Sequence, residues 1–333
     1  MTEESYGGNN GISKGKAMFT KKTASSIKAS IKEKKEASNP NSELDLESYR
    51  KAGEIARKIK EFARSIIKKE VKLVEIADKV ENKILELGGR PAFPVNLCIN
   101  EIAAHDTPKY GDERTTYGLL KIDFGVAVQG CICDVAFSLD LENNEENKKL
   151  IESSDKALAE ALKVIKKDVE IYKIGSKIHG IITASGFAPI RNLSGHEVSS
   201  YQIHAGLTIP NYDNGNENKL PEGAYAIEPF STNGQGLVYE GASSGIYRFE
   251  QIKGVRDMSA RKILEFILEE YKTMPFCERW LIKIFGTKAK LSLSFLQREG
   301  IIAQYPQLIE KGKGKVSQAE TTVLALDETE VLC

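Results

Sequence analysis

The sequence predicts an α+β fold in which helices pack against antiparallel β-strands. Several segments carry apolar residues every three or four positions, which is typical of amphipathic helices, and shorter apolar segments bounded by turn residues alternate with them. Some of the extended segments are joined by short turns, which favours antiparallel hairpins over a doubly wound parallel sheet. With 333 residues, 41% of them hydrophobic, the chain is long enough to bury a large core.

The helices are predicted from their apolar periodicity. A long amphipathic helix begins at Leu46, and a second spans 73–87. The second helix should end at Gly88-Gly89, because glycine readily adopts the left-handed conformation that closes a helix. Further helices are expected at 145–166 and 175–185 and in a helical block at 260–297.

The strands are predicted from short apolar segments flanked by turn residues. They are 93–99, 119–124, 131–139, 198–209, 224–230 and 316–326.

Composition excludes several classes of protein. Lys plus Arg and Asp plus Glu both number 47, so the net charge provides no general attraction to DNA or to an anionic membrane. The five cysteines lack the spacing of a metal ribbon, which indicates free thiols in a reducing compartment. No apolar run reaches the length of a membrane span, and the first residues do not form a signal peptide. We therefore expect a cytoplasmic protein without a membrane or DNA partner.

Residues 1–44 differ from the rest of the chain. They are rich in Lys, Ser, Asn and Gly, and their few apolar residues are scattered, so we expect a disordered tail with a fraying helix at 26–37. Eight Lys against five Glu leave the tail a surplus of three positive charges. The 14–35 stretch is a candidate for ribosome or RNA contact, although a solvated tail is the preferred interpretation.

Two aspartates lie in apolar segments joined by a short turn. Asp123 belongs to 121–125 and Asp134 to 131–135. If a two-residue turn centres on Val128-Gln129, these aspartates face each other on one side of the hairpin. Two carboxylates that close together stay ionised only if a cation lies between them. The pair therefore indicates a metal site, and one solvent-facing Asp on each strand edge is the alternative.

Histidine is scarce, and three of the four residues lie in turn-rich segments. These are His105, His196 and His204. His179 instead falls inside a predicted helix, where a surface or half-buried structural role is favoured.

Two glutamates complete a candidate ligand set. Glu228 and Glu320 each lie in an otherwise apolar strand, where an unpaired charge would cost several kcal/mol. Together with Asp123, Asp134 and one histidine they form an oxygen-rich set that suits two divalent ions. Cobalt, manganese, iron and zinc are all compatible with such ligands.

The same residues occur in this order in a known family. From about Leu46 to Val331 the sequence resembles the methionine aminopeptidases of the pita-bread fold, in metallopeptidase family M24, and specifically their type II branch. The motifs that carry the resemblance are Pro91-Ala92-Phe93-Pro94, 100–108, 121–125, Gly195-His196, 203–206, 226–229 and Gln318-Ala319-Glu320. The resemblance implies a catalytic domain over 45–333 with a type II helical insert at about 256–304.

The resemblance also implies metal ligands. Asp123 would chelate one divalent ion, Asp134 and Glu320 would bridge both ions, and His196 and Glu228 would complete the second site. Glu228 would also act as a proton shuttle. The implied activity is removal of the initiator methionine from nascent proteins by dinuclear metal-dependent hydrolysis, in a monomeric enzyme.

Substrate contacts follow from the same resemblance. His105 and His204 would hold the substrate and stabilise the tetrahedral intermediate. Phe93, Ile203 and Tyr305 would line the methionine pocket, where aromatic and aliphatic walls suit a flexible thioether.

Two departures from the family pattern concern neighbours of the ligands. Thr321 stands where the family usually has His, and Glu197 stands where a small residue is common. Neither removes a ligand, so the departures bear on rate more than on the class of reaction.

Two alternative functions remain open at this point. A related pita-bread peptidase that cleaves before proline uses a similar ligand set but usually carries a large N-terminal domain. A non-catalytic relative that binds ribosomes or RNA would typically have lost metal ligands, whereas all five are present here.

Overall fold

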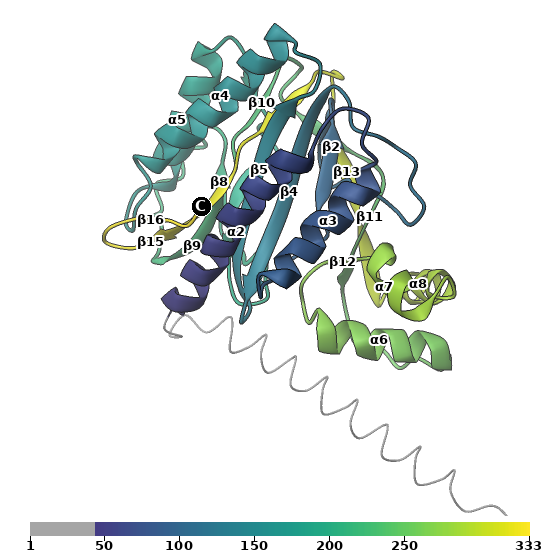
Figure 1. Cartoon of the computed structure of the whole chain (residues 1–333). Helices are drawn as coiled ribbons and strands as arrows, with labels where there is room; N and C mark the ends of the chain where they lie inside the picture. The colour runs from purple at the N-terminus through teal and green to yellow at the C-terminus, as the bar shows by residue number, and fades with distance from the viewer. Residues whose placement is uncertain (1–43) are drawn as a thin grey trace, which may run out of the picture.

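The computed structural model describes residues 44–333 (Figure 1). The predicted tail and its fraying helix lie outside the described residues, apart from Leu44. The helices are α2 (Leu46–Ile66), α3 (Leu73–Glu86), α4 (Glu145–Leu162), α5 (Ile171–Ala184), α6 (Met258–Glu270), α7 (Glu278–Phe285) and α8 (Ala289–Arg298). The strands are β1 (Arg90–Pro91), β2 (Asn96–Ile99), β3 (Ile102–Ala104), β4 (Leu119–Val128), β5 (Cys131–Asp140), β6 (Ala188–Pro189), β7 (Ser194–Val198), β8 (Thr208–Pro210), β9 (Gly223–Ile227), β10 (Phe230–Thr232), β11 (Val238–Phe249), β12 (Phe276–Cys277), β13 (Ile302–Glu310), β14 (Val316–Gln318), β15 (Thr321–Ala325) and β16 (Glu330–Val331).

The helix ends follow local sequence signals. Asp45 caps α2 by accepting a hydrogen bond from the backbone N–H of Ser48 at 3.0 Å, and Asn144 caps α4 in the same way. Gly88, just after α3, has a φ of 85°, as the helix-closing glycine requires. The helix predicted at 175–185 begins earlier, at Ile171.

All strand pairs are antiparallel, which confirms the predicted fold class. The sheets have the orders β1-β4-β2 with β5 paired to β4, β14-β10-β6, β12-β11-β13-β3 and β16-β15-β9-β7-β8. Figure 1 shows α2 and α3 lying across β4 and β5, α4 and α5 together at the upper left, and α6, α7 and α8 gathered at the lower right.

The main core lies between the first two helices and the central hairpin. Apolar side chains of α2 and α3 pack against the residues of β4 and β5 that face them, including Ile122 and Phe124. A second cluster joins α4 and α5 to β8, β9 and β15. Both faces of the molecule are therefore covered by helices, and the strand surfaces between them are free to present polar side chains.

The central hairpin differs from the predicted register. Val128 pairs with Cys131, so the turn centres on Gln129-Gly130 and not on Val128-Gln129. Both turn residues have positive φ, 50° and 90°, which the tight hairpin turn matching the strand twist demands. Glycine meets this demand more readily than valine does, and this decides the register.

Two predicted strands are interrupted. Only the ends of the predicted strand 198–209 are extended, in β7 and β8, and residues 199–207 form a loop between them. The backbone N–H of Glu197 closes this loop by donating to the Leu207 carbonyl at 2.8 Å. The predicted strand 316–326 breaks between β14 and β15, because β14 pairs with β10 whereas β15 pairs with β9. The break places Glu320 where the chain changes from one sheet to the other.

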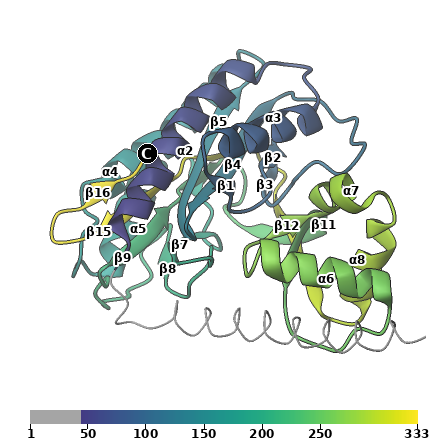
Figure 2. The ribbon, with the colours of Figure 1, turned by 60° about the horizontal axis from the view of Figure 1, so that its bottom comes forward.

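Two long strands, β11 and β13, were not predicted. Burial along β11 does not alternate, and its pairing with β13 shifts register twice between Glu240 and Tyr247. A strand with such bulges lacks the two-residue periodicity from which strands are recognised. Between them the predicted helical block forms α6, α7 and α8 (Figure 2). The apolar core of this block includes Tyr247 of β11 and Ile302 of β13.

The cysteines agree with the sequence. All five cysteines are free thiols, and four of them are buried. None of the helices within residues 44–333 has the length and apolarity needed to cross a membrane.

A substitution at Gly195 tests the close packing of β7 on β9. A Cβ at this position would lie 2.4 Å from the carbonyl oxygen of Ala226 on the paired strand. Gly195→Ala should therefore lower the free energy of unfolding by about 1–3 kcal/mol. Gly180→Ala is the matched control, because nothing lies within 4 Å of its Cβ position on α5. Its expected effect is a gain of about 0.5–1 kcal/mol. Equal melting temperatures for the two variants would contradict this packing.

Candidate active site

The five residues predicted as metal ligands line a single pocket of about 320 Å³. They come from β4, β5, β7, the turn after β9 and the break between β14 and β15. The predicted ligands in this pocket are Asp123, Asp134, His196, Glu228 and Glu320. Strand pairing brings them together from positions nearly 200 residues apart in the chain.

The two aspartates lie diagonally across the central hairpin. Asp123 pairs with Ala136, and Gly125 pairs with Asp134. Because Ala136 and Asp134 are two residues apart on β5, both aspartates still point to the same face. The corrected register thus keeps the predicted juxtaposition but makes it diagonal instead of directly opposed.

His196 and the two glutamates complete the group of predicted ligands. His196 Nε2 lies 3.7 Å from Asp134 Oδ2 and 3.6 Å from Glu228 Oε1. One ligand atom each of Asp134, His196 and Glu320 lies within 4.8 Å of the others, which is the spacing of ligands around one ion. Asp123 and Glu228 line the same pocket beside this triad.

The carboxylates repel one another in a buried setting. Burial raises the pKa of Asp123 to about 7. Burial raises the pKa values of Asp134, Glu228 and Glu320 well above their usual range as well, and the neighbouring carboxylates raise them further. Burial keeps His196 neutral by lowering its pKa to about 3. A neutral imidazole among carboxylates is the protonation state that binds a metal.

Three oxygens of this group are buried and without a hydrogen-bond partner among the described residues. They belong to Asp123 (Oδ1), Asp134 (Oδ1) and Glu320 (Oε1). Buried carboxylate oxygens are normally hydrogen-bonded, because leaving one unpaired is costly. Three such oxygens facing one pocket fit the requirements of divalent cations.

Two further histidines and a tyrosine lie beside the carboxylates. The rings of His196 and His204 are 4.5 Å apart, and those of His105 and Tyr305 are 5.2 Å apart. His105 adopts a left-handed φ of 60°, and its Nδ1 is buried without a partner among the described residues. Burial, the nearby His204 and Arg248 lower the pKa of His105 to about 4. His179 is half-buried on α5 and does not line the pocket.

The residues predicted for a methionine pocket lie in the same cavity. Phe93, Ile203 and Tyr305 all line it, together with Ile246 and Pro275. The lining therefore combines apolar and charged side chains, which suits a ligand with an apolar side chain next to a polar backbone group.

Gln318 belongs to the Gln318-Ala319-Glu320 motif, but its role was not predicted from the sequence. Its Nε2 donates to Glu320 Oε2 at 3.0 Å and contacts Glu228 Oε2 at 3.5 Å. Residues two apart in an extended chain point to the same side, so the position of Gln318 before Glu320 was a usable signal. Asn211 is a different case: it donates to the Glu228 carbonyl at 3.2 Å from a loop whose path the sequence does not indicate.

The two departures from the family pattern have structural partners away from the ligand oxygens. Thr321 Oγ1 donates to the carbonyl oxygen of Cys333 at 2.6 Å. The carboxylate of Glu197 accepts from the N–H of Leu207 at 3.3 Å, across the loop that carries Ile203 and His204. Glu197 thus helps to close the loop that supplies one wall of the pocket.

Comparison with known proteins agrees with this geometry. Residues 47–257 match the model of metallopeptidase family M24. A methionine aminopeptidase of Pyrococcus abyssi is 43% identical over 84% of this chain and 96% of its own length.

Solved structures share the fold. A thermophilic Arx1 superposes with a TM-score of 0.75 at 16% identity, covering 87% of this chain and 91% of the other. A methionine aminopeptidase of Thermotoga maritima superposes with a TM-score of 0.62 at 20% identity, covering 86% and 96%. At such identities the superpositions establish the pita-bread fold alone, whereas the sequence relatives establish kinship. The chain belongs to metallopeptidase family M24, among its methionine aminopeptidases.

Proposed function

We propose that this chain removes the N-terminal methionine from polypeptides by metal-dependent hydrolysis of the first peptide bond. The observation that carries the proposal is the convergence of five candidate ligand side chains on one pocket that apolar side chains also line. The identity to methionine aminopeptidases over most of the chain supports the same conclusion. The helices α6, α7 and α8 between β11 and β13 support assignment to the type II branch.

The ligand set is proposed to hold two divalent ions. Asp123 would bind one ion, His196 and Glu228 the other, and Asp134 and Glu320 both. The buried, unpaired oxygens of Asp123, Asp134 and Glu320 support a role in metal binding, because all three residues line the pocket. Cobalt, manganese, iron and zinc all suit carboxylates with one imidazole.

Divalent ions bound there would polarise the scissile carbonyl and lower the pKa of a water molecule. Glu228 lines the pocket, where its carboxyl group would accept a proton from the attacking water and deliver it to the leaving amine. Gln318 holds the carboxylates of Glu228 and Glu320 in place through its amide group. Burial lowers the pKa of His196, so its imidazole is available as a neutral ligand.

His105 and His204 would act on the substrate rather than on the metals. Both line the pocket next to Tyr305, and both have lowered pKa values, chiefly because of burial. Neutral imidazoles at these positions can donate a hydrogen bond to the developing oxyanion. Phe93, Ile203 and Tyr305 would bind the methionine side chain.

The alternative functions use the same fold and differ at the site. A prolidase of Pyrococcus furiosus also shares the fold, with a TM-score of 0.57 at 20% identity, so the fold alone does not separate the two peptidases. A role restricted to binding ribosomes or RNA is not favoured, because all five ligand residues line the pocket. Ribosome contact through the predicted basic tail concerns residues outside those described, and the monomeric state stays a prediction.

A peptide assay tests the proposed reaction. Chelator-stripped protein, reconstituted with cobalt, manganese, iron or zinc in turn, should hydrolyse Met-Ala-Ser and release methionine. Ala-Pro-Gly should remain intact under the same conditions. Exclusive turnover of the proline peptide would refute the assignment.

Glu228→Gln tests the proton shuttle. The substitution keeps the shape of the side chain but removes its proton-transfer group, so kcat should fall by about 10²–10⁴-fold. Substrate binding should remain measurable by calorimetry, with metal content determined on the same sample. His179→Ala is the control, because His179 does not line the pocket and should leave kcat unchanged. Substantial turnover by a metal-replete Glu228→Gln variant would remove Glu228 from this role.

The pH dependence of metal binding tests the raised pKa values. In the folded, metal-free protein burial raises the pKa of Asp123 to about 7, and burial with the neighbouring carboxyls raises the pKa values of Asp134, Glu228 and Glu320 well above their ordinary values of 3.8 and 4.5. The burial cost of the charged carboxylates is therefore absent near pH 4 and grows as pH rises toward 7. Metal ions relieve this cost and bind only the deprotonated groups.

The gain in melting temperature on adding Mn²⁺ should consequently increase from pH 5 to pH 8. Differential scanning fluorimetry of the same preparation with and without metal measures it, and titrating groups elsewhere cancel in the difference. A gain that is constant or decreases with pH would contradict the shared, cation-dependent carboxylate site.

A further inference from the structure

A buried arginine of the helical insert lies outside the pocket yet contacts segments that build it. Arg279 is in the first turn of α7, and only 1% of it is exposed. Its guanidinium donates to Glu81 of α3 twice, from Nη1 to Oε2 at 2.6 Å and from Nη2 to Oε1 at 2.8 Å. It also pairs with Asp78. Such a two-point contact fixes orientation as well as distance.

Glu81 transmits this contact to one wall of the pocket. Its Oε1 accepts a hydrogen bond from the backbone N–H of Val95 at 3.2 Å, and its Oε2 accepts one from Trp280 Nε1 at 2.8 Å. Val95 lies between Phe93 and Asn96, both of which line the pocket. Asn96 also pairs in register with the ligand Asp123. The carboxylate of Glu81 is therefore fixed on one side by the insert and holds the pocket wall on the other.

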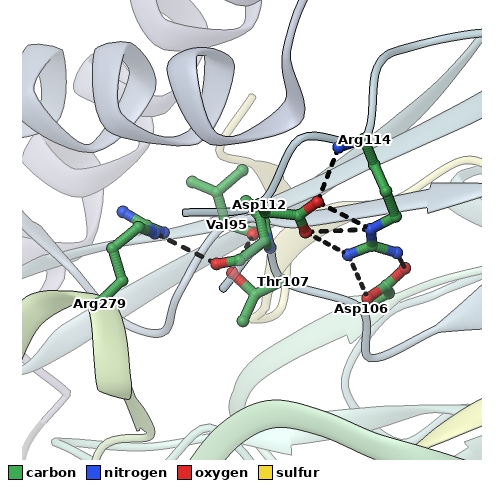
Figure 3. Close-up of polar contacts among 7 residues, drawn as sticks. Val95, Asp106, Thr107, Asp112, Arg114 and Arg279 are labelled. Atoms are coloured by element: carbon green, nitrogen blue, oxygen red, sulfur yellow. Dashed lines mark hydrogen bonds and ion pairs between the residues drawn. The ribbon is translucent and has the colours of Figure 1, made fainter. Parts of the chain in front are cut away.

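Arg279 reaches the segment that carries His105 as well. Its Nε donates to the carbonyl oxygen of Pro108 at 3.3 Å. Thr107 Oγ1 donates to the Val95 carbonyl at 2.9 Å, which ties the two segments together. In Figure 3 the guanidinium of Arg279 points toward the paired Thr107 and Val95. His105 lies two residues before Thr107.

The same segment has a second clamp on its other side. Arg114 Nη1 donates to Asp106 Oδ2 at 2.8 Å, and its Nη2 donates to Asp112 Oδ2 at 2.7 Å (Figure 3). Asp106 is buried, and its backbone carbonyl accepts from the N–H of Leu97 at 2.7 Å. His105, with its left-handed φ of 60°, therefore directly precedes two anchored residues, Asp106 and Thr107.

We infer that Arg279 and Glu81 are positioning residues for the reaction: through Val95 and Pro108 they set the places of Phe93 and His105, so that the helical insert acts on catalysis without touching the substrate. The inference rests on the proposed function, since Phe93 and His105 have their roles only there. A displacement of about 1 Å at a catalytic group is enough to lower the rate severely, which is why a remote anchor matters.

Substitutions at Arg279 test the inference in the full-length, metal-loaded protein. Arg279→Met should lower kcat on Met-Ala-Ser, per folded molecule and well below the melting temperature, by about ten- to a hundredfold. KM should rise as well, because Phe93 shifts. Arg279→Lys keeps the positive charge but loses the two-point contact with Glu81, so its kcat should lie between those of wild type and Arg279→Met.

Glu81→Gln is a milder substitution that tests the same inference if the arginine variants do not fold. It retains an acceptor for Val95 but weakens the contact to Arg279, and it should lower kcat in the same direction. The ¹⁵N chemical shifts of the His105 ring, read in labelled protein without substrate, should move in every variant that lowers kcat.

Lys283→Ala is the matched control on the same helix. Lys283 pairs with Asp78 at 2.9 Å, is 45% exposed and does not contact Glu81 in the described structure. It should leave kcat, KM and the His105 signals unchanged. If the Arg279 and Glu81 variants lose only melting temperature, with kcat and KM per folded molecule as in wild type, the residues are merely structural and the inference is wrong. A wild-type protein inactive on Met-Ala-Ser would instead overturn the proposed function, and the His105 signals would still decide the positioning.

Discussion

The structure depends on one electrostatic constraint: four carboxyl groups meet in a buried pocket where they cannot all be ionised without cations. Asp123, Asp134, Glu228 and Glu320 face one another around His196, and three of their oxygens lack partners among the described residues. Folding places this repulsion at the centre of the molecule. The apolar packing of α2 and α3 on the central hairpin, and of α4 and α5 on the neighbouring sheet, holds the carboxylates in place.

The pairing of the antiparallel strands fixes the positions of these carboxylates and of His196. Each ligand lies on a strand, at a strand end or at a break between strands, so that backbone pairing fixes its position. The break after Gln318 is the clearest case, because there the chain leaves β10 for β9 and presents Glu320 to the pocket. Substrate groups come instead from irregular segments: His105 from a left-handed residue, and His204 from the loop that Glu197 closes. The proposed metal ligands are thus placed by the sheet, and the residues that would meet the substrate are placed by side-chain and loop contacts.

Local signals were sufficient for the elements with clear periodicity. Both long N-terminal helices, the central hairpin and the helical insert could be predicted, because their apolar patterns and caps act within a few residues. The hairpin register could not be predicted without weighing the positive φ values that Gln129 and Gly130 adopt. The strands β11 and β13 escaped prediction because bulges destroy their periodicity, and the 198–209 segment was misjudged because apolar content alone does not distinguish a closed loop from a strand.

The sequence by itself determined the ligand types, their order and the kinship that they imply, because acidic and imidazole residues in apolar or turn-rich segments are chemically conspicuous. Only the tertiary structure decided which oxygens face one another, how Gln318 and Asn211 support the glutamates, and that Arg279 of a distant insert holds the wall beside Phe93. The physical reason is the separation along the chain over which each kind of interaction acts. Propensity, capping and turn preferences act along a few residues of chain, whereas pairing register, charge repulsion and buried ion pairs join positions up to nearly 200 residues apart.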